Sequence, residues 1–350
     1  MKVLVSGGCG FLGSNIAASY IAEGVEVIVL DALMRSGSAA NLRWLQSLAK
    51  PHQLHHYGVD LADHEAVERV FQRHSPIDYV CHLAGQVAMT TSISDPRRDF
   101  RTNALGTLNI LEAVRRFSPN TFVAYSSTNK VYGDLKAFSY AETPTRYIVP
   151  SHPNGFDESL PLDFASPYGC SKGAADQYVR DWHRTFGLQT VVFRHSSIYG
   201  GRQFATFDQG WIGWFCTTAL QQKEARERGE EPEPFTIAGT GKQVRDVLHA
   251  DDLIMLYRSA WASRSHVAGS IFNIGGGIGN SLSLLELFSI LEELLETTPL
   301  QFQRTPRRKS DQDFFVADIN ACTNATGWQP GVGARDGIAR MLAWCDAKPE

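Results

Sequence analysis

The chain opens with KVLVSGGCGFLG, residues 2–13, in which a short apolar run passes directly into a glycine-rich turn. Gly7, Gly10 and Gly13 have the GxxGxxG spacing. Glycines at these positions let a backbone approach a pyrophosphate, whose charge then meets free N–H groups at the positive end of a helix. The stretch therefore predicts a first strand, a dinucleotide-binding turn and a first helix.

The pattern around this stretch repeats for more than half of the chain. From residue 1 to about 195, Val/Ile/Leu-rich runs alternate with longer amphipathic stretches such as Glu65–His74 and Asn103–Phe117. This alternation predicts an α/β fold, a Rossmann-type doubly wound parallel sheet covered by helices. The predicted strands are Lys2–Ser6, Val25–Leu30, His55–Val59, Tyr79–Leu83, Thr121–Ser126 and Thr190–Arg194.

The regularity weakens after Tyr199, which predicts a second, smaller mixed α/β domain. Short apolar runs (Phe235–Ile237, Val247–His249, Ile271–Ile274) precede a helical pattern over Ser283–Leu295. We expect residues 1–195 to bind the dinucleotide and residues 196–350 mainly to bind substrate. Part of the second region, about 235–280, is expected to return to the large sheet.

Composition excludes several classes of protein. The 350 residues have a formal net charge of −4 with both signs mixed along the chain, so nucleic acid is not expected as a partner. No apolar run approaches the roughly 18 residues of a membrane span, and we expect a soluble, cytoplasmic protein. The six cysteines are scattered without metal-ligand spacing. His52, His55 and His56 are close in sequence, but we expect no metal site there.

Acidic and small residues follow the predicted strands where a dinucleotide would lie. Asp31 comes eighteen residues after Gly13, at the end of the second strand. A carboxylate there accepts hydrogen bonds from ribose hydroxyls and repels a 2′-phosphate, which favours NAD over NADP, although the nearby Arg35 weakens this preference. The turns after the third and fourth strands, Asp60-Leu61 and Leu83-Ala84-Gly85, are expected to contact the same cofactor.

Tyr168 and Lys172 lie four residues apart, so on a helix both side chains can face one cleft. An ammonium group and a positive nicotinamide would together stabilise a tyrosinate and make Tyr168 a useful general base. Thr128 follows another strand at its carboxyl end, where open α/β sheets bind ligands. Its hydroxyl can bridge the tyrosine and the substrate.

These motifs, in this order, resemble the extended short-chain dehydrogenase/reductase family over essentially the whole chain. The residues 126–133, SSTNKVYG, match the family's strand-end motif. The resemblance implies that Tyr168 is the acid/base, that Lys172 lowers its pKa and holds the nicotinamide ribose, and that Thr128 helps to move the proton. The implied cofactor-binding residues are Gly7, Gly10, Phe11, Leu12, Gly13, Asp31, Asp60, Leu61, Leu83, Ala84, Gly85, Asn103, Ser126, Tyr168, Lys172 and His195.

The residues after Thr128 narrow the activity. Sugar-nucleotide 4,6-dehydratases of this family have Asp-Glu there, whereas this chain has Asn129 and Lys130, which disfavours dehydration. Longer stretches, such as PYGCSKGAADQY at 167–178, resemble the family's 2-epimerases that convert CDP-paratose into CDP-tyvelose. The resemblance implies NAD-dependent oxidation at C2 to a 2-keto sugar, rotation and hydride return. The same chemistry on CDP-glucose, GDP-glucose or GDP-mannose, or another NAD-dependent sugar-nucleotide epimerase, stays open.

Arginines are the predicted ligands of the substrate diphosphate, because guanidinium groups form forked, charge-assisted bonds with phosphate. Arg202 and Arg245 are the main candidates and Arg307 is a third. The further predicted substrate contacts are Gln86, Thr90, Ser92, Asn129, Lys130, Ser196 and Gln203. We expect a homodimer or homotetramer that pairs through helices near Asn103–Phe117 and Lys172–Arg184, as the resemblance implies.

Overall fold

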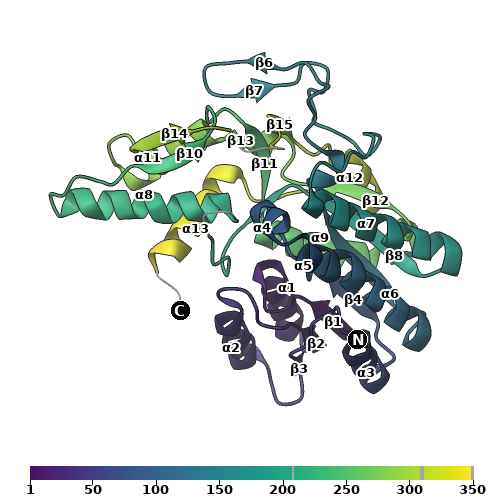
Figure 1. The fold of residues 1–350 in the computed structure, drawn as a ribbon. Helices are drawn as coiled ribbons and strands as arrows, with labels where there is room; N and C mark the ends of the chain where they lie inside the picture. The colour runs from purple at the N-terminus through teal and green to yellow at the C-terminus, as the bar shows by residue number, and fades with distance from the viewer. Residues whose placement is uncertain (207–208, 308–310, 348–350) are drawn as a thin grey trace.

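The computed structural model describes residues 1–206, 209–307 and 311–347. Its main element is a parallel sheet of seven strands (Figure 1). In spatial order the strands are β12 (Ile271–Ile274), β8 (Gln189–His195), β5 (Phe122–Thr128), β4 (Tyr79–His82), β1 (Lys2–Ser6), β2 (Glu26–Leu30) and β3 (Leu54–Tyr57). The strand order reverses beside β1, which places a topological switch point next to the glycine-rich turn.

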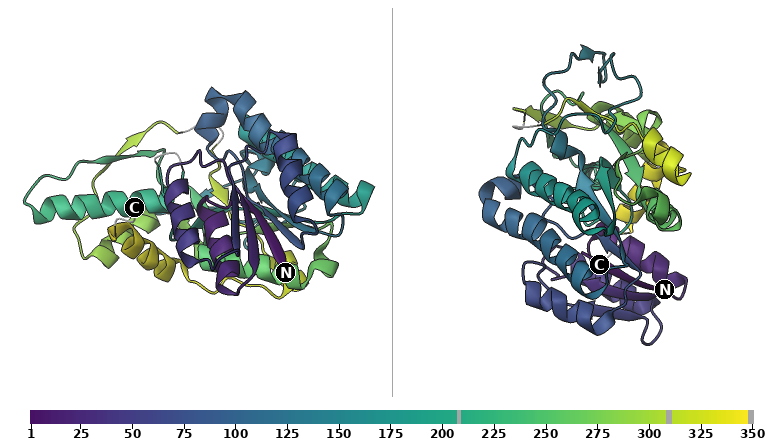
Figure 2. Two further views of the ribbon diagram at one scale, coloured as in Figure 1. Left: turned by 90° about the horizontal axis from the view of Figure 1, so that it is seen from below. Right: turned by 90° about the vertical axis from the view of Figure 1, so that its right-hand side faces the viewer.

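The central strands are buried on both faces, which explains their nearly continuous apolar sequence. In β1, Val3 and Val5 belong to one hydrophobic core, and Leu4 between them belongs to another. Successive side chains of a strand point to opposite faces, so one sheet builds two cores. Each core is closed by helices, which cover both faces of the sheet (Figure 2).

One face carries helices that pack around α1, and the other carries helices that pack around α6. On the first face lie α1 (Phe11–Ala22), α2 (Ser38–Leu48), α9 (Ala250–Ala262), α10 (Arg264–Val267) and α12 (Asn320–Thr326). On the second lie α3 (His64–His74), α5 (Pro96–Phe100), α6 (Gly106–Phe117) and α7 (Pro167–Phe186), with the short α4 (Met89–Ser94) beside α5 and α7. A π-helical turn, Arg101–Leu105, joins α5 to α6.

The second region has its own hydrophobic core, built mainly by three helices, α8 (Trp211–Glu227), α11 (Leu284–Leu295) and α13 (Ala334–Asp346). Two small sheets accompany them. Their strands are β10 (Phe235–Ala238) with β14 (Phe302–Thr305), and β11 (Val244–His249) with β9 (Ser197–Tyr199), β13 (Ser281–Ser283) and β15 (Phe314–Phe315). A separate hairpin, β6 (Ala141–Glu142) and β7 (Tyr147–Ile148), projects at the top of Figure 1.

The predicted fold class is confirmed, and all six strands predicted before residue 195 occur within two residues of their expected ends. The expected helix Asn103–Phe117 differs at its start, because its first three residues belong to the π-helical turn. After β11, the chain returns to the large sheet through α9 and β12. None of the helices described is both long and apolar enough to span a bilayer.

Candidate active site

A cleft of about 840 Å³ opens at the carboxyl ends of the parallel strands, between the large sheet and the second region. Open α/β sheets bind ligands at this edge because the turns after neighbouring strands converge there. The predicted site residues that line the cleft are Gly7, Gly10, Phe11, Leu12, Gly13, Asp31, Asp60, Leu61, Leu83, Ala84, Gly85, Gln86, Ser126, Thr128, Tyr168, His195, Ser196, Arg202 and Gln203.

The glycine-rich turn has no room for side chains. A Cβ atom on Gly13 would lie 2.1 Å from the carbonyl oxygen of Gly7, and one on Gly7 would lie 2.7 Å from the Ala84 backbone. Gly7 also has φ +69°, a conformation that glycine adopts at no steric cost. Helix α1 begins after Gly10, which has no side chain to cap the first N–H groups. The bare turn and the uncapped helix end together fit a pyrophosphate.

Asp31 follows β2 and turns its carboxylate toward the same turn. Its Oδ2 accepts a hydrogen bond from the Cys9 N–H at 2.9 Å, and its Oδ1 accepts one from the Leu33 N–H at 2.8 Å. Each carboxylate oxygen has a second lone pair, so the group can still accept from ribose hydroxyls. The position of Asp31 therefore fits the predicted NAD site.

His195 lines the cleft and has one nitrogen without a hydrogen-bond partner among the described residues. The side chain ends β8, is 5% exposed, and contacts the Ser126 hydroxyl through Nδ1 at 3.2 Å. Its Nε2 is buried without a hydrogen-bond partner among the described residues. Burial, followed by the charge of Lys172, lowers the pKa of His195 to about 3, so the ring is neutral at pH 7. A bound ligand that hydrogen-bonds Nε2 would remove the cost of this orphaned atom.

Helix α7 carries the predicted catalytic pair and begins at a well-capped end. The Ser166 hydroxyl accepts a hydrogen bond from the Gly169 N–H, and Pro167 occupies the first helical turn. Directly after Pro167, Tyr168 lines the cleft and its hydroxyl is hydrogen-bonded with Thr128. Lys172 lies behind it, 4% exposed, where Nζ donates to the Ser126 carbonyl.

Burial is the main cause of the pKa shifts of Tyr168 and Lys172. It raises the pKa of Tyr168 to about 12, and the hydrogen bond with Thr128 opposes this rise. It lowers the pKa of Lys172 to about 7, and the charges of Asp176 and Asp99 oppose that fall. The expected stabilisation of a tyrosinate is therefore absent from the protein alone, because desolvation outweighs the attraction to nearby charges. A bound positive ring would add the missing favourable charge.

Asp99 lies behind the catalytic helix and is completely buried. Its carboxylate accepts hydrogen bonds from the Ser171 hydroxyl, from Gln86 Nε2 at 2.9 Å and from Asn103 Nδ2 at 3.3 Å. Burial raises the pKa of Asp99, while the hydrogen bonds from Ser171 and Gln86 and the nearby charge of Lys172 oppose this rise. All three hydrogen-bond donors are neutral. Asp99 therefore positions the segment before Lys172 and supplies negative charge close to its ammonium group.

Replacing Asp99 by asparagine is expected to move the whole pH–rate profile to lower pH. The charge of Asp99 raises the pKa of both Lys172 and Tyr168, so its removal lowers both. The lysine then loses its proton at lower pH, and the base becomes available at lower pH. We expect roughly a tenfold loss of kcat on the alkaline limb, since one pKa unit changes the charged fraction tenfold. Steady-state rates between pH 5.5 and 9.5 measure the shift.

Asp181→Asn is the matched control, because Asp181 is an exposed carboxylate on the same helix. It should leave the profile in place. A lower rate at every pH with unchanged limbs in Asp99→Asn would show that Asp99 is only structural.

Several predicted site residues do not line the cleft. Asn103 is buried and holds the backbone of Gln86 and the hydroxyl of Ser171. Ser92 donates to the Met89 carbonyl. Asn129 donates to Gln312, and Lys130 pairs with Asp311. The substrate contacts predicted for the residues outside the cleft stay predictions. Outside the cleft lining are Asn103, Lys172, Thr90, Ser92, Asn129, Lys130, Arg245 and Arg307.

The predicted diphosphate ligands divide into two groups. Arg245 pairs with Asp311 at 2.8 Å, and Arg307 pairs with Asp313 at 2.8 Å, so carboxylates occupy both guanidinium groups. Arg202 lines the cleft and lies over the Trp44 ring at 4.3 Å. The ion pairs found in the described parts of the chain do not include Arg202, and burial lowers its pKa. Of the three, Arg202 is best placed to meet an anion.

Sequence reasoning missed other arginines of the cleft. Arg97, Arg98 and Arg101 line it from α5 and the π-helical turn. Arg35, which the sequence had already placed near Asp31, lines it from the loop after β2. The signal was present in the sequence as DPRRDFR at 95–101. Three arginines at the start of a helix that follows a strand end indicate an anion-binding region, but without the fold their direction was open.

Comparisons with known proteins agree with this geometry. The model of the "NAD dependent epimerase/dehydratase family" matches residues 3–275. A CDP-paratose 2-epimerase of Salmonella typhi is 55% identical over 344 residues, which cover 98% of this chain and 99% of the relative. A dTDP-glucose 4,6-dehydratase of Salmonella typhimurium is 28% identical, with 98% of this chain and 92% of the relative covered.

Solved structures of similar proteins share the whole architecture. A UDP-glucose 4-epimerase from Thermotoga maritima, solved with UDP-glucose, superposes with a TM-score of 0.80 at 28% identity and covers 100% of both chains. A UDP-glucose 4-epimerase from Thermus thermophilus, solved with NAD, gives a TM-score of 0.78 at 29% identity and covers 99% of both chains.

Proposed function

The chain belongs to the NAD dependent epimerase/dehydratase family, and from that premise we propose that it inverts C2 of a CDP-hexose, converting CDP-paratose into CDP-tyvelose. The observation that carries the proposal is the 55% identity with a CDP-paratose 2-epimerase over nearly the full length of both chains. A putative UDP-glucose 4-epimerase of Methanocaldococcus jannaschii and two dTDP-glucose 4,6-dehydratases, one of them named as probable, are 28–30% identical. The protein is thus an NAD-dependent isomerase.

NAD, when bound, supplies the hydride acceptor for C2 and returns the same hydride. We propose that the glycine-rich turn and the start of α1 hold its pyrophosphate, that Asp31 accepts from its ribose, and that Lys172 holds the nicotinamide ribose. The bare turn, the carboxylate and the unsatisfied His195 nitrogen support this assignment.

Tyr168 is the proposed acid/base. It stands at the cleft surface with Thr128 beside it, so its deprotonated, tyrosinate oxygen can take the proton of the C2 hydroxyl and later return it. Transient oxidation gives a 2-keto sugar, which rotates about its link to the diphosphate and presents its other face. Residues of the second region, Phe204 and Gln209 among them, line one side of the cleft and would limit the access of bulk water to the hydride path.

The proposed phosphate contact is the Arg202 guanidinium, which has no carboxylate partner among the described residues that form the cleft. The Asn41 amide donates to the carbonyl of Cys9 at 3.1 Å and to the carbonyl of Arg202 at 3.3 Å. This tie holds the Arg202 backbone beside the glycine-rich turn. Arg202 also has φ +68°, a strained conformation for a non-glycine residue that is typical of ligand sites. We propose that Arg202 binds phosphate between the cofactor and the sugar nucleotide.

Dehydration is not supported as a second activity. Asn129 stands at the position of the dehydratases' acid, is 7% exposed, and donates to Gln312 Oε1 at 3.2 Å. Lys130 lies against Asp311 at 3.8 Å. Neither side chain offers a carboxyl group to the cleft, and elimination of water needs both an acid and a base.

Incubation with CDP-paratose in deuterated water is expected to invert C2 without placing deuterium there. A hydride held on the cofactor never meets solvent, so the C2–H signal keeps full intensity in proton NMR. Parallel reactions with CDP-glucose, GDP-glucose and GDP-mannose test the preference for the sugar and for the nucleobase, and CDP-paratose should turn over fastest. Deuterium at C2 would establish deprotonation of carbon and contradict the proposed chemistry, and faster turnover of another sugar nucleotide would contradict the proposed substrate.

We also propose a homodimer or homotetramer that works in the cytoplasm. Apolar side chains of the second face stay exposed in the single chain, including Phe100 (58%), Tyr178 (43%) and Phe186 (45%) on α5 and α7. All six cysteines are free thiols, which suits a reducing compartment. Light scattering of the purified protein measures the oligomeric state, and a monomer alone would contradict this proposal.

A further inference from the structure

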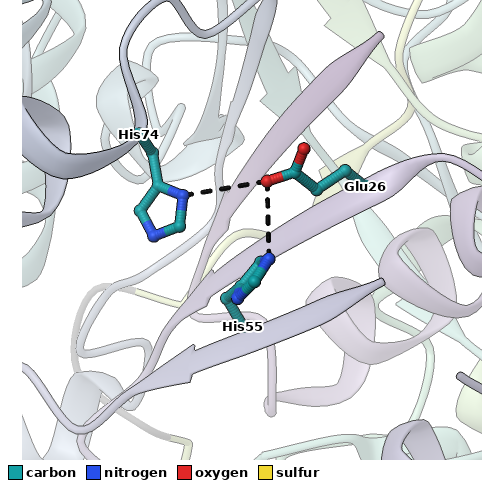
Figure 3. A group of neighbouring side chains, drawn as sticks. All are labelled: Glu26, His55 and His74. Atoms are coloured by element: carbon teal, nitrogen blue, oxygen red, sulfur yellow. Dashed lines mark ion pairs between the residues drawn. The ribbon is translucent and has the colours of Figure 1, made fainter. Parts of the chain in front are cut away.

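Glu26, His55 and His74 point toward one another (Figure 3). They lie at the amino ends of β2 and β3, opposite the carboxyl ends of the strands where the cleft opens. Glu26 is the first residue of β2, His55 lies near the start of β3, and His74 is the last residue of α3. The carboxyl end of β2 leads instead to Asp31 in the cleft. The cluster is therefore separate from the candidate active site and has no part in its chemistry.

The spacing of the three side chains is that of ligands around an ion. Glu26 Oε1 lies 3.4 Å from His55 Nε2 and 3.8 Å from His74 Nδ1, and the three atoms all lie within 4.8 Å of one another. Both measured contacts exceed the roughly 2.7–3.2 Å of an N–H···O hydrogen bond. Ligands about 2.1 Å from a tetrahedral ion stand about 3.4 Å apart. A small movement of the half-exposed His55 and Glu26 side chains reaches that geometry.

The surroundings hold His74 in a ligand's orientation. Its Nε2 contacts the Tyr57 hydroxyl at 2.8 Å, and its carbonyl accepts from Lys2 Nζ at 2.7 Å. In the tautomer whose Nε2 donates to the Tyr57 hydroxyl, Nδ1 presents its lone pair toward Glu26, which is the arrangement of metal-bound imidazoles. Burial and the nearby charges, His55, Lys2 and Arg73 among them, lower the pKa of His74.

We propose that Glu26, His55 and His74 bind a zinc-like divalent cation that ties β2, β3 and α3 together. Two imidazole nitrogens and one carboxylate oxygen suit Zn²⁺ or Co²⁺, whereas Mg²⁺ and Ca²⁺ prefer oxygen ligands. Lys2 and Arg73 are nearby positive charges that repel a cation, and the Glu26 carboxylate offsets part of this repulsion. Water completes the coordination from the exposed side, where His55 is 30% and Glu26 is 37% exposed.

The site is tested by calorimetric titration with ZnCl₂ of the tag-free protein with NAD bound, after a chelator has removed any metal ion. We expect one saturable Zn²⁺ per chain and a Tm that rises by several degrees, because the ion binds the folded state alone. Addition of CoCl₂ should give the visible absorption bands of a four-coordinate nitrogen- and oxygen-bound ion. His55→Gln and Glu26→Gln should each weaken Zn²⁺ binding by roughly 100-fold or more, since even outer residues of a metal site contribute 10- to 100-fold.

His64→Gln is the matched control, because His64 is an exposed histidine at the other end of α3. It should bind Zn²⁺ as the wild type does, and all three variants should keep the epimerase rate. Wild-type protein that takes up no Zn²⁺ would show that the cluster is an ion pair only. Stoichiometric Zn²⁺ binding that persists in both His55→Gln and Glu26→Gln would place the ion elsewhere. Either result overturns the proposal.

Discussion

Tyr168→Phe is expected to lower kcat by about 10³-fold while the protein still folds and keeps NAD, because general acid–base catalysis contributes about 10²- to 10⁴-fold. The substitution removes only the hydroxyl that is hydrogen-bonded with Thr128, and the ring keeps its place on α7. The phenylalanine ring also avoids a buried, poorly solvated hydroxyl, so stability should change little. The C2 NMR assay measures turnover, and the nucleotide released on denaturation measures bound NAD.

Tyr178→Phe provides the matched control on the same helix. Tyr178 is 43% exposed and stacks edge-on with Trp182, a contact that phenylalanine retains. This variant should epimerise at the wild-type rate. Turnover of Tyr168→Phe within tenfold of wild type would show that another group moves the proton, and the cleft would then need a different base.

Gly13→Ala is expected to abolish NAD binding, with a loss of at least about 100-fold in affinity and about 3 kcal/mol in stability, the upper range for overpacking. The new methyl group would lie 2.1 Å from the Gly7 carbonyl oxygen and 2.7 Å from Gly8 Cα. Both neighbours are backbone atoms of the turn, so they cannot move aside as a flexible side chain would. The turn must open, and its N–H groups then no longer point toward the pyrophosphate. NAD fluorescence titration and thermal unfolding measure the two effects.

Gly58→Ala separates this effect from the general cost of replacing glycine. Gly58 follows β3, is exposed, and its added Cβ would meet no atom within 4 Å. We expect unchanged NAD affinity and equal or slightly higher stability, because alanine reduces the conformational freedom of the unfolded chain. If Gly13→Ala binds NAD as well as Gly58→Ala does, the glycine-rich turn is not the pyrophosphate site.

Local sequence was sufficient for the sheet and for the catalytic helix. The apolar runs of β1 and β5 and the four-residue spacing of Tyr168 and Lys172 depend on strand and helix periods that neighbouring residues set by themselves. The turn at Gly7 has a local cause in its φ of +69°, whereas the backbone of Ala84, which leaves no room for a Cβ atom there, is brought in by the fold. These features could therefore be predicted before any tertiary contact was known.

Burial decided the chemistry of the catalytic pair. The sequence puts Tyr168 and Lys172 on one helix face, but it does not show that packing removes both from water. Desolvation then raises the pKa of Tyr168 to about 12 and lowers the pKa of Lys172 to about 7, so it disfavours the charged form of both side chains. The buried charge of Asp99, which comes from a different helix, became visible only through this packing.

Tertiary structure alone decided which charged side chains share a site. Arg245 forms an ion pair with Asp311, whereas Arg97 and Arg101 line the cleft. The histidines show the same limit. His55 and His56 are adjacent in sequence, yet a strand sends them to opposite faces, and His56 contacts the Asp31 carbonyl instead. His55 meets Glu26 and His74 because parallel strands and a returning helix bring their ends together across long stretches of chain. Secondary structure follows from local sequence, whereas long side chains take their partners from whichever elements the fold sets beside them.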